Sequence, residues 1–296
     1  MKTNVTHDSG LKRGVGGIIS KVYGSWPART LKIMVPRTVR RKVSGMIGAV
    51  LAAFEDWIYL RAHDVPYLPP RPLRFRVLGS TDIAGFLATG EIVARNLTDA
   101  LGRLGRNISS FENVLDLGCG CSRVLRWYEK YSGPCKFYGT DIDRDAIYWD
   151  KENILFAKFT VNGELPPLPY PPETFDLIYG ISIFTHIDEK YQFQWLSELA
   201  RVAKSKAILI MTVHGRYARD LAGLSPAAAA QLEDKGFLFV KGDAWKGIFP
   251  DSYQNTFHTK AYVLKEWAKY FDVLEYIERG LNEHQDMIVL MKADRA

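Results

Sequence analysis

The pattern of hydrophobic and polar positions changes about one third of the way along the 296-residue chain. Before residue 105, apolar positions recur at helical spacing over residues 41–60 and again over 80–104. From residue 113 onward, short apolar runs alternate with amphipathic stretches. This alternation of strands and helices predicts an α/β fold with a doubly wound sheet and helices on both faces.

Seven apolar runs have the length of a buried strand. Strands are expected over 113–117, 136–140, 157–161, 174–179, 207–213, 273–277 and 287–291, and helices over 122–130, 144–153, 191–203 and 260–270. The last two strands are close enough in sequence to form an antiparallel pair. Residues 214–257 interrupt the alternation with a long mixed insert, a common place for elements that cover a substrate.

The sequence before the alternating strands and helices predicts an N-terminal extension that contains a connector. Proline-rich residues 66–74 (PYLPPRPLR) predict an extended connector that is not helical. Gly90 predicts a break in the helix over 80–104. We therefore predict a helical, basic extension over residues 1–77 and a larger domain over 78–296.

Charge is shared unevenly between these two parts. Residues 1–77 hold 14 Lys or Arg against 4 Asp or Glu, a net charge of +10, whereas the whole chain carries +6. A basic segment suits nucleic acid or an anionic lipid surface. A solvated arm is the favoured interpretation, because aromatic and basic residues are not interleaved as a base-stacking platform requires.

The three cysteines predict neither disulfides nor a metal site. Cys119 and Cys121 stand two apart, but no second Cys or His pair stands at ligand spacing. Reduced thiols point to the cytoplasm. The best apolar run near the N-terminus, residues 43–54, has 12 residues and is too short to span a bilayer, so a soluble protein is expected.

The segment NVLDLGCGCSR, Asn113–Arg123, joins the first strand of the alternation to the element that follows it. Glycines let a ligand approach the backbone, and a helix N-terminus offers free amides, so a nucleotide turn is indicated. Asp116 precedes Gly118 and Gly120, and it would repel a pyrophosphate but attract the ammonium of an amino acid. Arg123 also stands where a dinucleotide fingerprint has its third glycine. S-adenosylmethionine therefore fits this turn better than a nicotinamide dinucleotide.

A second acid follows the next strand. Asp141 lies 21 residues beyond Gly120, at the end of the run FYGTD. A carboxylate here can accept both hydroxyls of a ribose. Asp143 is the better cap for the following helix, which leaves Asp141 for the ribose.

With both acids in place, the chain resembles the class I S-adenosylmethionine-dependent methyltransferases. Their first motif resembles VLDLGCGCSR, and their fourth-strand region resembles LPPLPYPPETFDLIYGISIFTHI, residues 165–187. Residues 195–215, WLSELARVAKSKAILIMTVHG, are similar to the family's helix and fifth strand. The resemblance covers about residues 78–296. It implies a Rossmann-like, mostly parallel, seven-stranded sheet with an antiparallel C-terminal strand.

The resemblance also implies a cofactor site for S-adenosyl-L-methionine. The residues that match the family's motif are Asp116, Gly118, Gly120, Ser122, Asp141 and Asn162. Ser122 stands where a third glycine is frequent, and Asn162 stands near the family's acid for the adenine amine. Its amide oxygen could accept the same hydrogen bond.

Histidines are the candidate bases. Methyl transfer depends mostly on positioning of the reactants, and an alcohol acceptor also benefits from proton removal, for which histidine titrates in the useful range. His186 follows the fourth strand, at the carboxyl end where ligands bind, and His258 follows the insert. These two are the predicted catalytic residues. His214 and His284 are weaker candidates.

The absence of certain sequence motifs limits the chemical class of the methyl acceptor. Residues 179–182 (YGIS) replace the Asp/Asn-Pro-Pro-aromatic run of nucleobase amine methylation, and neither a Pro-Cys nucleophile nor a magnesium arrangement is apparent at the site. An oxygen or nitrogen of a small molecule or glycan is therefore the expected acceptor. Aromatic residues of the insert could stack on it: Phe237, Trp245, Phe249, Tyr253 and Phe257.

Three alternatives remain open from sequence. The basic extension could anchor RNA for an RNA methyltransferase, or it could hold the enzyme against a membrane. The chain could also be a non-catalytic module that keeps the fold. The oligomeric state is not predicted.

Overall fold

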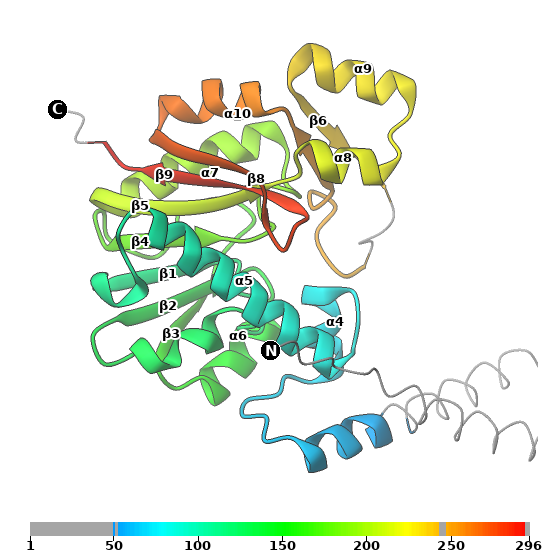
Figure 1. Cartoon of the computed structure of the whole chain (residues 1–296), viewed down its shortest axis with the longest axis vertical. Helices are drawn as coiled ribbons and strands as arrows, with labels where there is room; N and C mark the ends of the chain where they lie inside the picture. Colours follow the sequence, from blue (N-terminus) through cyan, green and yellow to red (C-terminus); the bar gives the residue numbers. More distant parts are fainter. Residues whose placement is uncertain (1–49, 51–52, 243–246, 294–296) are drawn as a thin grey trace, which may run out of the picture. The chain divides into compact units, whose positions relative to one another are not determined.

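The computed structural model describes residue 50 and residues 53–242 and 247–293 (Figure 1). The chain divides into two compact units, Met1–Val65 and Pro66–Ala296. In the first unit, residues 53–62 form a helix, which overlaps the C-terminal part of the helix predicted over 41–60. The N-terminal part of that predicted helix lies mostly outside the described residues.

The second unit is built on a seven-stranded sheet in the order β3-β2-β1-β4-β5-β9-β8. The strands are β1 (Asn113–Leu117), β2 (Lys136–Asp141), β3 (Ala157–Val161), β4 (Phe175–Gly180), β5 (Ala203–Val213), β8 (Asp272–Leu281) and β9 (Gln285–Met291). The first five pair in parallel, and β9 runs antiparallel to both β5 and β8. The predicted doubly wound sheet with an antiparallel C-terminal strand is confirmed.

Helices cover both faces of this sheet (Figure 1). The helices of this unit are α4 (Arg71–Leu78), α5 (Ile83–Arg103), α6 (Arg144–Asn153), α7 (Glu189–Val202), α8 (Arg216–Ala222), α9 (Pro226–Lys235) and α10 (Lys260–Glu266), with short 3₁₀ helices at Ile108–Ser110, Leu125–Tyr131 and Trp267–Lys269. Apolar residues of α5 pack in one core with Val114 and Phe137. Those of α7 pack in a second core with Leu115 and Ile178, so alternate residues of the strands face opposite layers.

The strand order reverses between β1 and β4. The chain runs from β1 outward through β2 and β3, then returns to pair β4 on the other side of β1. Helices therefore leave on opposite faces there, and a crevice forms at the carboxyl ends of these two strands.

The proline-rich connector is partly helical, contrary to the prediction. Helix α4 begins directly after Pro70, with Pro72 in its first turn, and Gly79 in the left-handed conformation ends it. Proline is tolerated in a first turn because the amides there have no helical partner. Helix α4 also belongs to the second unit, although the sequence places it in the extension.

Two other local predictions are wrong. Helix α5 passes through Gly90 without a break. Glycine is needed there for close packing, because a Cβ would lie 2.3 Å from the carbonyl oxygen of Arg123. The predicted helix over 122–130 is a turn followed by the 3₁₀ helix Leu125–Tyr131. Ser122 has φ +54°, so no right-handed helix can begin at that residue.

The insert folds back onto the crevice. It contains α8, α9 and a two-stranded antiparallel sheet of β6 (Phe237–Val240) and β7 (Asn255–His258). Main-chain amides of Gln254 and Thr256 donate to the carbonyls of His186 and Thr185, just beyond β4. The insert is therefore tied to the segment that follows the sheet's carboxyl edge.

None of the helices in the described part of the chain is by itself long and apolar enough to cross a bilayer. Helices α4 and α5 together have the length and composition of a span, with a bend of 47° between them.

Candidate active site

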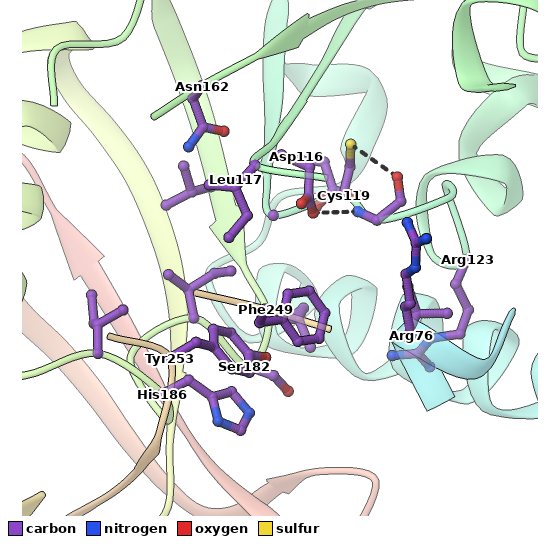
Figure 2. Close-up of a pocket in the computed structure, with 18 of the residues that line it drawn as sticks. Arg76, Asp116, Leu117, Cys119, Arg123, Asn162, Ser182, His186, Phe249 and Tyr253 are labelled. Carbon is purple, nitrogen blue, oxygen red and sulfur yellow. Dashed lines mark hydrogen bonds between the residues drawn. The ribbon is translucent and has the colours of Figure 1, made fainter. Parts of the chain in front are cut away.

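A cavity of about 520 Å³ lies where the strand order reverses. Its walls come from α4, the turn after β1, the ends of β2 and β3, residues 181–195 and residues 249–255. Figure 2 shows Asp116 and Cys119 toward one end of this cavity and His186 and Tyr253 toward the other. The volume falls within the range of a small-molecule site.

The turn after β1 is packed tightly from two sides. Gly118 has φ +73° and Gly120 has φ +55°, conformations that favour glycine. A Cβ at Gly118 would lie 2.1 Å from Cδ1 of Ile183, and one at Gly120 would lie 2.4 Å from Cγ1 of Val77 in α4. Both glycines are therefore required by their backbone conformation and by their neighbours.

Asp116 lies buried at the end of β1 and lines the cavity. Its Oδ2 has no hydrogen-bond partner among the described residues. Burial raises the pKa of this carboxyl to about 8; the Tyr179 hydroxyl opposes the shift, and the charge of Asp141 adds to it. A buried carboxyl oxygen without a partner is unfavourable, so a cationic ligand in the cavity would supply a missing interaction.

Asp141 also lines the cavity, and its carboxylate holds the turn. Its Oδ2 accepts a hydrogen bond from the amide of Gly120, and its Oδ1 accepts one from the amide of Asp143, each at 2.8 Å. Asp143 is the cap of α6, as predicted. Each carboxylate oxygen has a second lone pair, so Asp141 keeps acceptor capacity toward a ribose.

Of the other two predicted cofactor residues, one lines the cavity and one does not. Asn162 lines the cavity, but its Oδ1 already accepts a hydrogen bond of 2.8 Å from the Thr140 hydroxyl. Its second lone pair remains available for an adenine amine. Ser122 is fully buried and is not among the lining residues, so its predicted contact with the cofactor has no support in the geometry.

His186 is a cavity residue held by the insert. Its Nδ1 lies 2.8 Å from the carbonyl oxygen of Gln254, so Nδ1 carries the proton and donates it, and Nε2 is the basic nitrogen. Burial lowers the pKa of His186 to about 3, and the neighbouring His214 adds to this effect. His214 and His284 also line the cavity, as the weaker candidates.

His258, the second predicted catalytic residue, lies elsewhere. It is 2% exposed, its Nε2 lies 2.9 Å from Oε1 of Gln192, and it is not among the lining residues. Its ring packs against Phe237, Tyr262 and Trp267. The structure therefore gives His258 a position in the core rather than at the candidate site.

Aromatic rings of the insert form a row along the cavity. Phe249 stacks on Tyr253 with centroids 4.5 Å apart, and Tyr253 stacks on His186 at 4.2 Å. Among the other aromatic candidates, Phe237 and Phe257 are buried in the core, and Trp245 lies outside the described residues.

Two arginines at the cavity were not recognised as site residues from sequence. Arg76 lies on α4, just after the predicted connector over 66–74, and Arg123 stands where a dinucleotide fingerprint has a glycine. Their position depends on how α4 and the turn pack, and no local pattern encodes it. Within the described residues, no group of three His, Cys, Asp or Glu side chains could hold a metal ion.

A family model and two curated proteins match parts of this chain. Residues 115–211 match the model of a methyltransferase domain. Ajmaline N-methyltransferase of Rauvolfia serpentina is 31% identical over 127 residues, which cover 41% of this chain and 42% of that protein. A probable chloroplastic tocopherol O-methyltransferase of Oryza sativa subsp. japonica is 32% identical over 108 residues, covering 34% and 28%.

One solved structure aligns with most of this chain at low sequence identity. Human N-acetylserotonin methyltransferase in complex with SAM aligns with a TM-score of 0.49 and 12% identity, covering 75% of this chain and 56% of that one. The chain spans less than half the length of the curated relatives it matches.

Proposed function

The chain belongs to the class I S-adenosylmethionine-dependent methyltransferases, and from this premise we propose that it methylates an oxygen or nitrogen of a small molecule. The observation that carries the proposal is a single cavity. One end holds the glycine turn and an unpartnered Asp116, and the other holds His186 in a row of aromatic rings.

The residues present fit the cofactor. Asp116 suits the ammonium of its amino-acid end, Asp141 the ribose and Asn162 the adenine, and the glycines let it approach the backbone. When bound, S-adenosylmethionine supplies a methyl group on a positively charged sulfur. The protein has to hold the acceptor in line with that methyl group and to exclude water, and positioning of this kind can lower a barrier by about 7–11 kcal/mol.

We assign proton removal from a hydroxyl acceptor to His186. The Gln254 carbonyl fixes its tautomer, so that Nε2 is the nitrogen able to receive a proton. The lowered pKa keeps the ring neutral near pH 7, so Nε2 can accept a hydrogen bond from the acceptor hydroxyl, and it also makes this ring a weaker base than a free histidine.

The acceptor we propose is an uncharged compound with a ring. The row of Phe249, Tyr253 and His186 offers flat faces for stacking, and Ser182 and Gln285 on the cavity wall hydrogen-bond to each other at 2.8 Å. Aromatic faces beside amide and hydroxyl groups suit a phenol or a sugar ring. The matched relatives are named for methylation of ajmaline at nitrogen and tocopherol at oxygen, which supports a small-molecule acceptor.

Two measurements test this function. Calorimetry with S-adenosylmethionine and S-adenosylhomocysteine should show one site, and NADH should not bind. Incubation with methyl-labelled S-adenosylmethionine and fractionated extract should then label a small-molecule fraction. Binding of NADH in place of both adenosyl ligands would overturn the proposal, and cofactor binding without labelling of any fraction would favour a non-catalytic module.

A further inference from the structure

We propose that the helix of residues 53–62 binds along the surface of an anionic lipid membrane, with one apolar face in the lipid and the basic N-terminal sequence beside the headgroups. The inference goes beyond the proposed function, because it concerns where the enzyme works and uses no residue that lines the cavity. The observation that carries it is a stripe of large apolar side chains that are exposed on one side of this helix.

Four exposed apolar side chains stand at helical spacing in this part of the first unit. The exposed fractions are 68% for Val50, 53% for Phe54, 51% for Trp57 and 39% for Ile58. Positions i, i+4, i+7 and i+8 share one side of an α-helix, so these side chains form a single surface, here called the apolar face. Contiguous apolar surface of this kind gains free energy when it leaves water, and it marks an interaction site.

The rest of the helix is suited to the boundary between lipid and water. Glu55 and Asp56 stand roughly 100° and 200° around the helix axis from Phe54, on the polar side. Arg61 lies within the apolar face, and its guanidinium stands 4.8 Å from the centroid of the Trp57 ring. An arginine in this position packs its stem along apolar surface and keeps its charge at the interface, where tryptophan rings are also favoured.

The surrounding sequence supplies charge that is complementary to an anionic surface. The first unit, residues 1–65, carries a net charge of +7, and four of the six residues in 37–42 (RTVRRK) are Lys or Arg. Residues 37–42 lie outside the described part of the chain, and their charge follows from the sequence alone. A basic cluster next to an amphipathic helix is attracted by the negative surface potential of anionic lipids.

Two other binding modes are disfavoured by the same residues. A platform for RNA bases has aromatic rings interleaved with basic residues, whereas this apolar face includes the aliphatic Val50 and Ile58, which cannot stack on bases. Insertion of the helix across a bilayer would place Glu55 and Asp56 in hydrocarbon, which is costly for a carboxylate. The helix therefore lies along the membrane surface rather than through it.

The test measures co-sedimentation of the full-length protein with lipid vesicles. Phosphatidylcholine vesicles that contain phosphatidylserine should bind the protein about tenfold or more tightly than vesicles of phosphatidylcholine alone, and added salt should weaken this binding. A variant with both Phe54→Ala and Trp57→Ala should bind the anionic vesicles about 10–100-fold more weakly. Alanine favours a helix, so loss of helical structure does not account for that result.

Two control variants separate the apolar face from general effects of charge and apolar surface. Leu155→Ala with Leu221→Ala removes side chains of the second unit that are exposed by 81% and 62%, and vesicle binding should stay within about twofold. Arg41→Gln with Lys42→Gln should weaken binding to anionic vesicles and reduce its salt dependence. All variants should keep the affinity for S-adenosylhomocysteine, because none of these residues is among those that line the cavity.

Several outcomes would overturn the membrane site. They are a wild type that binds neither kind of vesicle, a Phe54–Trp57 variant that binds vesicles like the wild type, and an equal loss in the Leu155–Leu221 control. Sedimentation velocity and RNA retention cover the other occupants. Without vesicle binding, a wild-type dimer that dissociates in the Phe54–Trp57 variant assigns the apolar face to a second copy of the chain, and RNA binding that this variant loses assigns it to nucleic acid. The proposed function stands in each case, because calorimetry with the cofactor tests it separately.

Discussion

At the scale of single residues, the site is defined by side chains whose surroundings are incomplete. Oδ2 of Asp116 and Nε of Arg123 are buried polar atoms without hydrogen-bond partners among the described residues, and the carboxylate of Asp141 accepts a hydrogen bond from the turn. His186, by contrast, is fully oriented by a main-chain carbonyl before any ligand arrives. A ligand at the cofactor end of the cavity would therefore supply missing polar contacts, whereas His186 at the acceptor end is already oriented without one.

Asp116 should make the ligand-free protein less stable as pH rises. Its pKa is raised to about 8 in the folded state, so between about pH 4 and pH 8 the folded state binds more protons than the unfolded state. The free energy of unfolding should fall over this range, by at most about 1.4 kcal/mol per pH unit for one such group. Urea unfolding at pH 5 to 9 should show a shallower decline for Asp116→Asn; an unchanged slope would contradict the assignment.

His186→Ala should reduce turnover on a hydroxyl acceptor by about 10²–10⁴-fold with little change in cofactor affinity. Because the pKa of His186 is lowered to about 3, the wild-type rate should show no titration of this ring between pH 5 and 9. His258→Asn is the matched control: it should lower the stability and keep the rate. Single-turnover measurements with labelled cofactor decide between these outcomes, and an unchanged rate for His186→Ala removes it from the mechanism.

At the scale of elements, close packing decides what local propensity leaves open. The turn after β1 lies against α4 through Val77 and against the segment after β4 through Ile183. Helix α5 packs against the same turn region at Gly90, where the carbonyl oxygen of Arg123 occupies the space that a side chain at position 90 would fill. The position of Arg123 thus depends on a glycine 33 positions away in the chain.

Two glycines of α5 should respond oppositely to the same substitution. Gly90→Ala gains about 1 kcal/mol of helix propensity, but its Cβ would lie 2.3 Å from a main-chain oxygen, so a net loss of about 1–3 kcal/mol is expected. Gly102→Ala, near the end of the same helix, meets no atom within 4 Å and should be neutral or stabilising by up to about 1 kcal/mol. Thermal and urea unfolding of both variants measure this, and equal effects would show that Gly90 is not a packing position.

At the scale of the whole molecule, all residues that line the cavity lie between Arg76 and Gln285, within the second unit. The first unit, residues 1–65, holds 11 Lys or Arg against 4 Asp or Glu, a net charge of +7. Cofactor chemistry and any attraction to anionic surfaces are therefore assigned to separate units.

Removal of residues 1–65 should leave the affinity for S-adenosylhomocysteine within about twofold, because none of them lines the cavity. The same truncation should abolish salt-dependent binding to RNA or to vesicles of anionic lipid, if the full chain shows either. Calorimetry and co-sedimentation at two salt concentrations separate these effects. Loss of cofactor affinity on truncation would show that the first unit contributes to the site.

The sequence by itself determined the seven strands of the main sheet, the helices α5, α6, α7 and α10, the family resemblance and most residues of the cofactor turn. These features are local: period-two and period-3.6 patterns, and an acid and two glycines within five residues, follow from short-range geometry. Asp116, Gly118, Gly120 and Asp141 are accordingly at the cavity.

Only the tertiary structure decided the rest of the site. In the tertiary structure, α4 and the insert line the crevice, and Arg123 lies near enough to Asp116 to affect its pKa. His258 and Ser122 are buried and do not line the cavity. These positions result from contacts between segments far apart in the chain. A residue gives the same local sequence pattern whether its side chain lines the cavity or packs in the core. Packing between elements, rather than local propensity, therefore determines which charged side chains remain unpaired and available to a ligand.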